Sequence, residues 1–161
     1  MKVRDFYLKD FATAHKDAEL YQLIEISIKK GTNGIFIIDN EGRLEGLVSI
    51  FNILEAIIPK SLKENPDLSA VASGCLFAHL IENKKHLTAQ DIMCTKVPRV
   101  KLDTKIIEIA ANSLQDENYR LAVVDDEGKV IGVINRTILR EIIAKQLNIS
   151  KETGTLFQFY Q

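Results

Sequence analysis

Apolar residues recur every three or four positions in four stretches of the chain, the spacing that gathers them on one face of a helix. The first stretch, residues 17–30, carries them at Leu20, Leu23, Ile24 and Ile28. Asp17 is the expected N-cap of this helix and Gly31 its expected end. The same pattern predicts helices over residues 49–58, 103–115 and 135–147, and Pro59 ends the one at 49–58 because proline cannot continue a helix.

Short apolar runs without helical spacing lie between these helices, at residues 35–38, 44–48, 121–124 and 130–134. Runs of this length and content indicate buried strands. Gly42 and Gly128 lie in the turns between the paired runs, where a left-handed backbone is often required. With a short strand in the stretch before the first helix, each half of the chain is predicted to be a β-α-β-β-α unit.

The two halves are copies of one sequence. IIDNEGRLEGLVS at 37–49 matches VVDDEGKVIGVIN at 123–135 with a constant offset, since 128 − 42 and 132 − 46 both give 86. The same offset pairs further residues without a gap: Asp5 with Asp91, Asp17 with Asp103, Ser27 with Ser113 and Glu55 with Glu141. A repeat that keeps its register this long predicts two equivalent structural units.

The repeat divides the chain into a first unit at 1–60, a helical linker at 61–88, a second unit at 89–148 and a C-terminal tail at 149–161. The linker contains an apolar run at 68–81 that we expect to be helical and to pack on the module or on a partner. Four tail residues are also expected to dock, with a second subunit as one place for them: Leu156, Phe157, Phe159 and Tyr160.

The composition is that of a globular protein, with 46% hydrophobic and 27% charged residues. A net charge of −1 gives no basic face for nucleic-acid binding. Cys75 and Cys94 form no CxxC pattern, so reduced thiols are expected rather than a disulfide framework or a zinc site. No apolar stretch resembles a signal peptide or is long enough to span a membrane. We therefore expect a cytoplasmic protein that has no membrane as a partner.

The duplicated order of strand, Asp-x-x-Gly turn, strand ending in Gly-h-h-[Ser/Thr]-x-x-[Asp/Asn], and helix resembles the paired cystathionine-β-synthase (CBS) domain, or Bateman module. The resemblance spans residues 3–58 and 89–146. It implies an α/β (α+β) fold of two pseudo-twofold-related β-α-β-β-α units packed through their sheets, with two clefts between them and, here, a helical linker insertion.

The resemblance also implies a function. CBS pairs bind adenine nucleotides (AMP, ADP or ATP) or S-adenosylmethionine in these clefts, commonly form dimers, and regulate another protein. For this chain it implies a non-enzymatic, stand-alone regulatory module with a small-molecule nucleotide as ligand, a homodimer as its assembly, an unknown effector protein as a separate partner, and no metal.

Ser49 and Asn52 are the first candidate ligand residues. A capping side chain and one three residues later both lie beside the unpaired amides at a helix start, where a polar ligand is favoured. By resemblance, they would bond the ribose hydroxyls. The alternative is an ordinary helix cap. In the second repeat Asn135 and Ile138 take these places, and because isoleucine makes no hydrogen bond, the second cleft is expected to be degenerate.

Further ligand positions follow from the resemblance, one at a time. The polar residue after the first short strand, near the adenine, is Thr13 in one repeat and Arg99 in the other. The residues before the second strand, lining the base or reaching the phosphates, are Asn33, Gly34 and Ile35, then Tyr119, Arg120 and Leu121. Phe36 and Ala122 stand where the family often has proline, a departure that affects the base pocket.

Phosphate contacts are expected from His15, Arg120 and Arg136, because guanidinium groups match phosphate oxygens and the pseudo-twofold brings residues of one unit toward the cleft of the other. The alternative is a solvated surface group, which is the more common place for an arginine.

Two alternatives come from different classes of protein. One is a scaffold with vacant clefts that acts through dimerisation and protein contact, which Ile138, Phe36 and the apolar linker favour. The other is a metal site on one helix face formed by Cys75, His79, Glu82 and His86. These four span about 16 Å of helix, too far for one ion, so Cys75 and His79 are expected to face the core. The acidic groups at 39–41 and 125–127 are interpreted as solvated turns.

Overall fold

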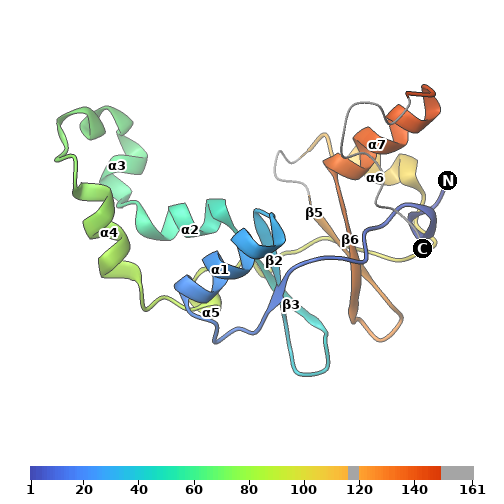
Figure 1. Cartoon of the computed structure of the whole chain (residues 1–161), viewed down its shortest axis with the longest axis horizontal. Coiled ribbons are helices and arrows are strands. Elements are labelled where there is room, and N and C mark those ends of the chain that lie inside the picture. Colours follow the sequence, from blue (N-terminus) through green and yellow to red (C-terminus); the bar gives the residue numbers. More distant parts are fainter. Residues whose placement is uncertain (116–119, 150–161) are drawn as a thin grey trace. The chain divides into compact units, whose positions relative to one another are not determined.

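The structure is a computed structural model that describes residues 1–115 and 120–149 (Figure 1). The first repeat forms β1 (Thr13–Ala14), α1 (Leu20–Lys30), β2 (Gly34–Ile38), β3 (Leu44–Ser49) and α2 (Ile50–Ile57). The second repeat forms β4 (Arg99–Val100), α6 (Ile106–Asn112), β5 (Arg120–Val124), β6 (Val130–Asn135) and α7 (Arg136–Gln146). The predicted β-α-β-β-α order and the mixed α+β fold class are therefore confirmed for both repeats.

Each repeat contributes one three-stranded sheet, with the strand orders β1-β2-β3 and β4-β5-β6. β1 lies parallel to β2 with Thr13 opposite Phe36, and β4 lies parallel to β5 with Arg99 opposite Ala122. The offset of the sequence repeat holds in space, since 99 − 13 and 122 − 36 both give 86.

Both sheets bury apolar side chains beneath helices. One core combines α1, β2, β3 and α2 and includes Leu23, Ile35, Ile37, Val48 and Ile53. The other combines α6, β5, β6 and α7 and includes Ile109, Leu121, Val123, Ile134 and Ile138. The central strand β2 is buried at its first four residues, whereas β3 alternates between buried and half-buried positions, as expected for a strand with one face on the core.

The turns and helix ends follow the sequence in most places. Gly31 ends α1 with a left-handed φ of 58°, and Gly42 and Gly128 occupy the two strand turns at 81° and 83°. The prediction of Asp17 as N-cap was wrong, because α1 begins three residues later, after Glu19. The carbonyl groups of Lys16 and Ala18 accept hydrogen bonds from Gln90 and Ala89, which hold this stretch outside the helix.

The second repeat shows a similar difference at the start of α6. The helix predicted from residue 103 begins at Ile106. The Leu102 and Thr104 carbonyl groups accept hydrogen bonds from the Arg4 and Val3 amides, which hold this stretch outside the helix. The Asp103 carboxylate also forms ion pairs with Lys2 and Arg4. These ion pairs connect the N-terminal segment to the second repeat.

The chain forms two compact units whose limits do not follow the repeats. Unit A comprises Ala12–Asn40 and Glu45–Lys96, and unit B comprises Met1–Phe11, Glu41–Leu44 and the chain from Val97 onward. The segment that leads into each repeat therefore packs with the other repeat. The division predicted from the repeat, at residues 60, 88 and 148, stays a prediction about sequence units.

Two short antiparallel β-bridges hold each of these segments against the other repeat, an arrangement called here the exchange. Leu8 pairs with Val133 in unit B, and Cys94 pairs with Leu47 in unit A. The two bridges are equivalent under the repeat, since 94 − 8 and 133 − 47 both give 86. Each adds backbone hydrogen bonds, of 2.9 and 3.0 Å at Leu8 and 2.9 Å at Cys94, to the outer strand of a sheet. An outer strand is thereby covered rather than left with free amide and carbonyl groups.

The linker consists of short helices rather than one run. It forms α3 (Lys60–Glu64), the 3-10 helix η2 (Pro66–Val71), α4 (Leu76–Lys84) and, at the start of the second repeat, α5 (Ala89–Ile92). α4 packs on α2, and Leu80 joins the core of unit A. The expected packing is thus only partial, because other apolar linker residues are exposed: Leu68, Val71, Phe77 and Ile81.

Cys75 and His79 are exposed, so the prediction that they face the core was wrong. α4 turns only its Leu76 and Leu80 side inward, and both Cys75 and His79 lie on the side left to solvent. The aromatic tail residues fall outside the described part of the chain.

The exchanged bridges predict an unequal cost for alanine at two equivalent glycines. A Cβ at Gly132 would lie 2.5 Å from the Leu8 carbonyl oxygen and overlap the Tyr7 ring, whereas a Cβ at Gly46 would lie 3.1 Å from the Cys94 carbonyl oxygen and press mainly on the flexible Met93. We expect Gly132→Ala to lower the free energy of unfolding by about 3 kcal/mol or more and Gly46→Ala by about 1 kcal/mol. Urea denaturation of both variants measures the difference in the free energy of unfolding. Equal losses of stability would contradict this explanation of the close contacts at the two bridges.

Glu141 predicts a pH dependence of stability. Its side chain is 6% exposed, its Oε2 atom has no hydrogen-bond partner among the described residues, and burial raises its pKa while the neighbouring charge of Arg140 works in the opposite direction. The folded protein therefore binds a proton more readily than the unfolded chain, so stability falls as pH rises from the ordinary glutamate pKa through the raised one.

Glu141→Gln removes this buried charge. We expect about 1 kcal/mol more stability at pH 7.5 and a flatter stability curve in weakly acidic buffer. Glu55→Gln is the matched control, because Glu55 occupies the same place in the first repeat and is exposed. Thermal unfolding across a pH series tests both variants, and a Glu141→Gln curve that keeps the wild-type slope would count against the prediction.

Candidate functional site

Ser49 and Asn52 close the N-terminus of α2 with a reciprocal cap. The Asn52 amide N–H donates to Ser49 Oγ at 3.3 Å, while the Ser49 backbone N–H and hydroxyl donate to Asn52 Oδ1 at 2.9 and 2.7 Å. Both residues are half-buried. The cap expected from the sequence is therefore present, and its two side chains are bonded to each other.

The cap leaves hydrogen-bonding capacity on both of its side chains. Asn52 Nδ2 donates no hydrogen bond within the described residues, and Ser49 Oγ keeps a second lone pair. The Asn33 carbonyl oxygen lies next to them, because it accepts the Ile50 N–H at 3.1 Å. The edge of the unit A sheet where β2 begins and β3 ends thus presents the Asn52 Nδ2 donor and the Ser49 hydroxyl oxygen, a pair that can bind a hydroxylated ligand.

Gly34 and Ile35 are the first two residues of β2, directly after Asn33, and both are buried. The Ile35 side chain packs in the core of unit A at 2% exposure, so it does not reach this edge. Of the three positions predicted before the second strand of the first repeat, Asn33 is the exposed one.

Thr13 and His15 lie elsewhere in unit A. Thr13 is the first residue of β1, not a residue after it, because parallel pairing with β2 begins there. His15 follows β1 at the carboxyl end of the parallel strands, the edge of the sheet opposite to Ser49. The structure therefore does not bring His15 together with Ser49 and Asn52 within this unit.

The second repeat keeps the cap but not the ligand group. Asn135 is the N-cap of α7 and its Oδ1 accepts the Ile138 N–H at 3.1 Å. Ile138 is 1% exposed and belongs to the core of unit B. The helix start of the second repeat therefore has an apolar core residue where the first repeat has the Asn52 amide.

Three arginines of unit B take different roles. Arg120 begins β5 opposite Asn135, is half-buried, and has a pKa lowered by burial, although a guanidinium stays charged at neutral pH. Arg136 donates to the Ser113 carbonyl at 2.7 Å, at the C-cap of α6. Arg99, the first residue of β4, donates to the Leu44 carbonyl at 3.1 Å. Arg120 and Arg136 thus place two positive charges at the edge of the β4-β5-β6 sheet where Asn135 lies.

Phe36 and Ala122 cannot be replaced by the proline that the resemblance would place there without losing sheet hydrogen bonds. The Phe36 N–H donates to the Ala12 carbonyl at 2.9 Å and the Ala122 N–H to the Pro98 carbonyl at 3.2 Å. A proline has no N–H for either bond. Tyr119 lies outside the described residues.

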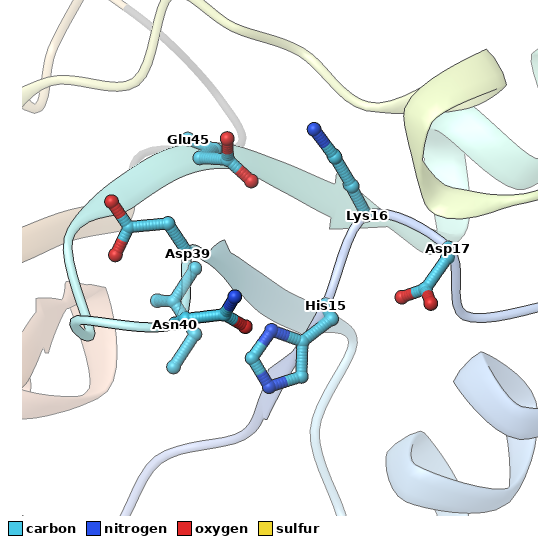
Figure 2. A pocket seen from close by; sticks show the side chains of 7 residues that line it. His15, Lys16, Asp17, Asp39, Asn40 and Glu45 are labelled. Atoms are coloured by element: carbon cyan, nitrogen blue, oxygen red, sulfur yellow. The ribbon is translucent and has the colours of Figure 1, made fainter.

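A pocket of about 380 Å³ in unit A was missed by sequence reasoning (Figure 2). It lies at the carboxyl ends of β1 and β2, and Ile38 supplies its apolar part. Its polar lining comes from three segments: His15, Lys16, Asp17, Asp39, Asn40 and Glu45. Asp39 and Asn40 were interpreted only as turn residues. The sequence signal that could have shown the pocket is the difference between the repeats, since Lys16 and Glu45 have Leu102 and Ile131 as their equivalents.

No three histidine, cysteine or acidic side chains within residues 1–115 and 120–149 come together to hold a metal ion. Cys75 and Cys94 are free thiols. In the same described part of the chain, every helix is too short or too polar to cross a bilayer.

Several proteins resemble this chain in sequence. An uncharacterized protein of Methanocaldococcus jannaschii, MJ1426, is 26% identical over 158 residues, covering 89% of this chain and 91% of its own length. The chloroplastic CBS domain-containing protein CBSX2 of Arabidopsis thaliana is 27% identical, covering 81% of this chain and 56% of the relative. L-aspartate semialdehyde sulfurtransferase of M. jannaschii is 25% identical, but the match covers only 21% of that enzyme.

Solved structures share the fold. The crystal structure of CBSX2 from Arabidopsis thaliana superposes with a TM-score of 0.75 at 22% identity, covering 92% of this chain and 98% of that one. The CBS domain pair of protein MJ0100, in complex with 5′-methylthioadenosine and S-adenosyl-L-methionine, superposes with a TM-score of 0.68 at 23% identity, covering 91% and 98%.

The sequence model of the CBS domain matches residues 3–59 and again residues 89–145. These two matches coincide with the repeats that form the two β-α-β-β-α folds, and together they span more than half of the chain. The chain therefore belongs to the CBS domain family and carries two copies of the domain as a Bateman module.

Proposed function

We propose that this protein is a cytoplasmic regulatory module that binds an adenosine-containing ligand at the helix start of its first repeat, and that ligand binding changes the activity of a separate effector protein. The observation that supports the proposal is the Ser49–Asn52 cap, which leaves Asn52 Nδ2 without a partner among the described residues beside the amides of α2. A related CBS pair of known structure has S-adenosyl-L-methionine and 5′-methylthioadenosine bound. Two free, exposed thiols suit a reducing compartment.

The chemistry of this edge suits a ribose. A hydroxyl of the sugar can accept a hydrogen bond from Asn52 Nδ2, and another can donate to the free lone pair of Ser49 Oγ. Because Asn52 is neutral, these bonds lack the charge-assisted strength that an aspartate would give.

Arg120 and Arg136 of unit B stay predicted phosphate contacts. Both are cationic side chains beside the Asn135 cap of the second repeat, and a partly buried guanidinium is stabilised by an anion. The second repeat, with Ile138 in the core, supplies no equivalent of Asn52 for a second ribose.

A scaffold role is the second candidate, and the exposed apolar side chains of α2 and α4 favour it. Phe51, Leu54, Phe77 and Ile81 lie on these two packed helices and are 38–58% exposed. A second copy of the chain would cover them in a homodimer. In this role the module would act through dimerisation and protein contact without a ligand.

Thermal unfolding with AMP, ADP, ATP, S-adenosylmethionine and 5′-methylthioadenosine tests ligand binding. A ligand present at a hundred times its dissociation constant should add about 2.7 kcal/mol of stability. Asn52→Ala removes the free donor, and we expect the affinity to fall about 5- to 150-fold. Thr88→Ala is the control: it removes the hydrogen bond from the Thr88 hydroxyl to Asp91 at the start of α5, costs about 1 kcal/mol of stability, and should leave the ligand-induced shift unchanged. A shift that survives Asn52→Ala would place the ligand elsewhere, and no shift with any compound would favour the scaffold.

Light scattering coupled to gel filtration tests the homodimer. We expect a mass of twice 18.1 kDa for the wild type and a loss of the dimer in Phe51→Ser combined with Phe77→Ser, because apolar area buried between the copies is removed. Ile107→Ser, at an exposed position of α6 in unit B, should remain dimeric. A wild type that elutes at the mass of one chain would rule out this assembly.

A further inference from the structure

The pocket at the carboxyl ends of β1 and β2 is separate from the proposed nucleotide edge. Its polar lining follows these two parallel strands and includes Glu45 from the start of β3, whereas Ser49 ends β3. The five residues of β2 lie between the two places, a length of about 16 Å. The carboxyl ends of parallel strands are a common place for small ligands in open sheets, because neighbouring loops diverge there.

The second repeat shows what this place looks like when it is closed. The equivalents of His15 and Asn40 are Lys101 and Asp126, which form an ion pair of 2.7 Å. The equivalents of Lys16 and Glu45 are Leu102 and Ile131, and both pack against the core of unit B. The same backbone can therefore be completed with an ion pair and apolar packing.

The first repeat leaves the corresponding groups without partners. Within the described residues, the side chains of His15, Lys16, Asn40 and Glu45 take part in no hydrogen bond or ion pair. Glu45 is nevertheless half-buried, and Figure 2 shows Glu45, Lys16 and Asp17 around the space on different sides, with His15 and Asn40 beside one another. A half-buried carboxylate where the sister repeat has an isoleucine costs desolvation that a ligand of opposite charge would offset.

The charges of the side chains that line the pocket indicate which charges a ligand must carry. Apart from Asp39, the lining carries two negative charges, on Asp17 and Glu45, and one positive charge, on Lys16, so the formal charge of these groups is −1 with His15 neutral. A simple anion would be repelled by this lining, and a simple cation would leave Lys16 unmatched. A molecule with two positive groups and one carboxylate matches both signs. The volume of about 380 Å³ lies at the lower end of the range for small-molecule sites.

We propose that this pocket binds a small basic amino acid, with one cationic group toward Glu45, the other toward Asp17, and its carboxylate toward Lys16. Such a site gives the module an input distinct from the ligand at the Ser49 edge. Only the first repeat has it, because Leu102, Ile131 and the Lys101–Asp126 pair close the equivalent place in the second.

Isothermal titration calorimetry with L-lysine and with cadaverine, which lacks the carboxylate, tests the proposal. We expect L-lysine to bind with one site per chain and cadaverine to bind at least fivefold more weakly. Lys16→Leu, which installs the residue of the second repeat, should remove this preference by weakening L-lysine alone. Glu45→Gln and Glu45→Ile should each weaken both compounds at least tenfold.

Glu127→Gln is the control, because Glu127 is an exposed acid in the turn of the second repeat and should leave both affinities unchanged. The proposal is overturned if L-lysine gives no binding heat at millimolar concentration, if Glu45→Gln binds as the wild type does, or if Glu127→Gln weakens binding as much as Glu45→Gln. The adenosine-ligand shift should persist in Glu45→Gln, so loss of that shift alone bears on the nucleotide proposal and leaves the pocket proposal standing.

Discussion

The structure depends on how the segment that leads into each repeat, called here the lead-in segment (residues 1–11 and 89–96), is paired. Each lead-in segment pairs with the outer strand of the other repeat. Leu8 covers β6 at Val133, and Cys94 covers β3 at Leu47, with the same register in both places. The contact is so close that the strand residue beside it is a glycine in both repeats, Gly46 and Gly132. Without this pairing each sheet would end in a strand with free amide and carbonyl groups, and neither core would include its lead-in residues, such as Val3 in unit B.

On this common backbone the two repeats have diverged at both ends of their sheets. At the helix start, the first repeat has Asn52 and the second has the core residue Ile138. At the opposite edge, the first repeat has a polar pocket and the second an ion pair above apolar side chains. The first repeat thus keeps polar groups available at both edges of its sheet. The second repeat uses the equivalent positions for packing and for an ion pair, and it has Arg120 and Arg136 at the edge where Asn135 lies. The repeat symmetry belongs to the backbone, and the chemistry of the two halves is different.

The sequence predicted the features that local physics controls. The strands at 35–38 and 130–134, the turn glycine Gly42 and the caps Ser49 and Asn135 all follow from patterns within a few residues, and the constant offset extended them to both repeats. The start of α1 was misplaced because distant residues hold the chain at Lys16 and Ala18.

Features made by distant segments could not be read in this way. The exchange of the lead-in segments joins residues such as Leu8 and Val133, which no local pattern connects. The pocket joins three segments that are separate in sequence, and its residues look like ordinary turn and surface groups until they are compared with their equivalents. At the helix start, Ser49 and Asn52 were recognised, but their mutual hydrogen bonds required coordinates.

The exchanged pairing also has a bearing on how such a chain could arise. One repeat alone would carry a lead-in segment with no strand to cover and an outer strand with no cover. Two identical copies would satisfy each other through a closed, twofold-symmetric exchange. Gene fusion would turn that intermolecular exchange into the internal one seen at Leu8 and Cys94. Once both copies are on one chain they are no longer obliged to be identical, which leaves one copy free to lose its polar groups while the other retains them.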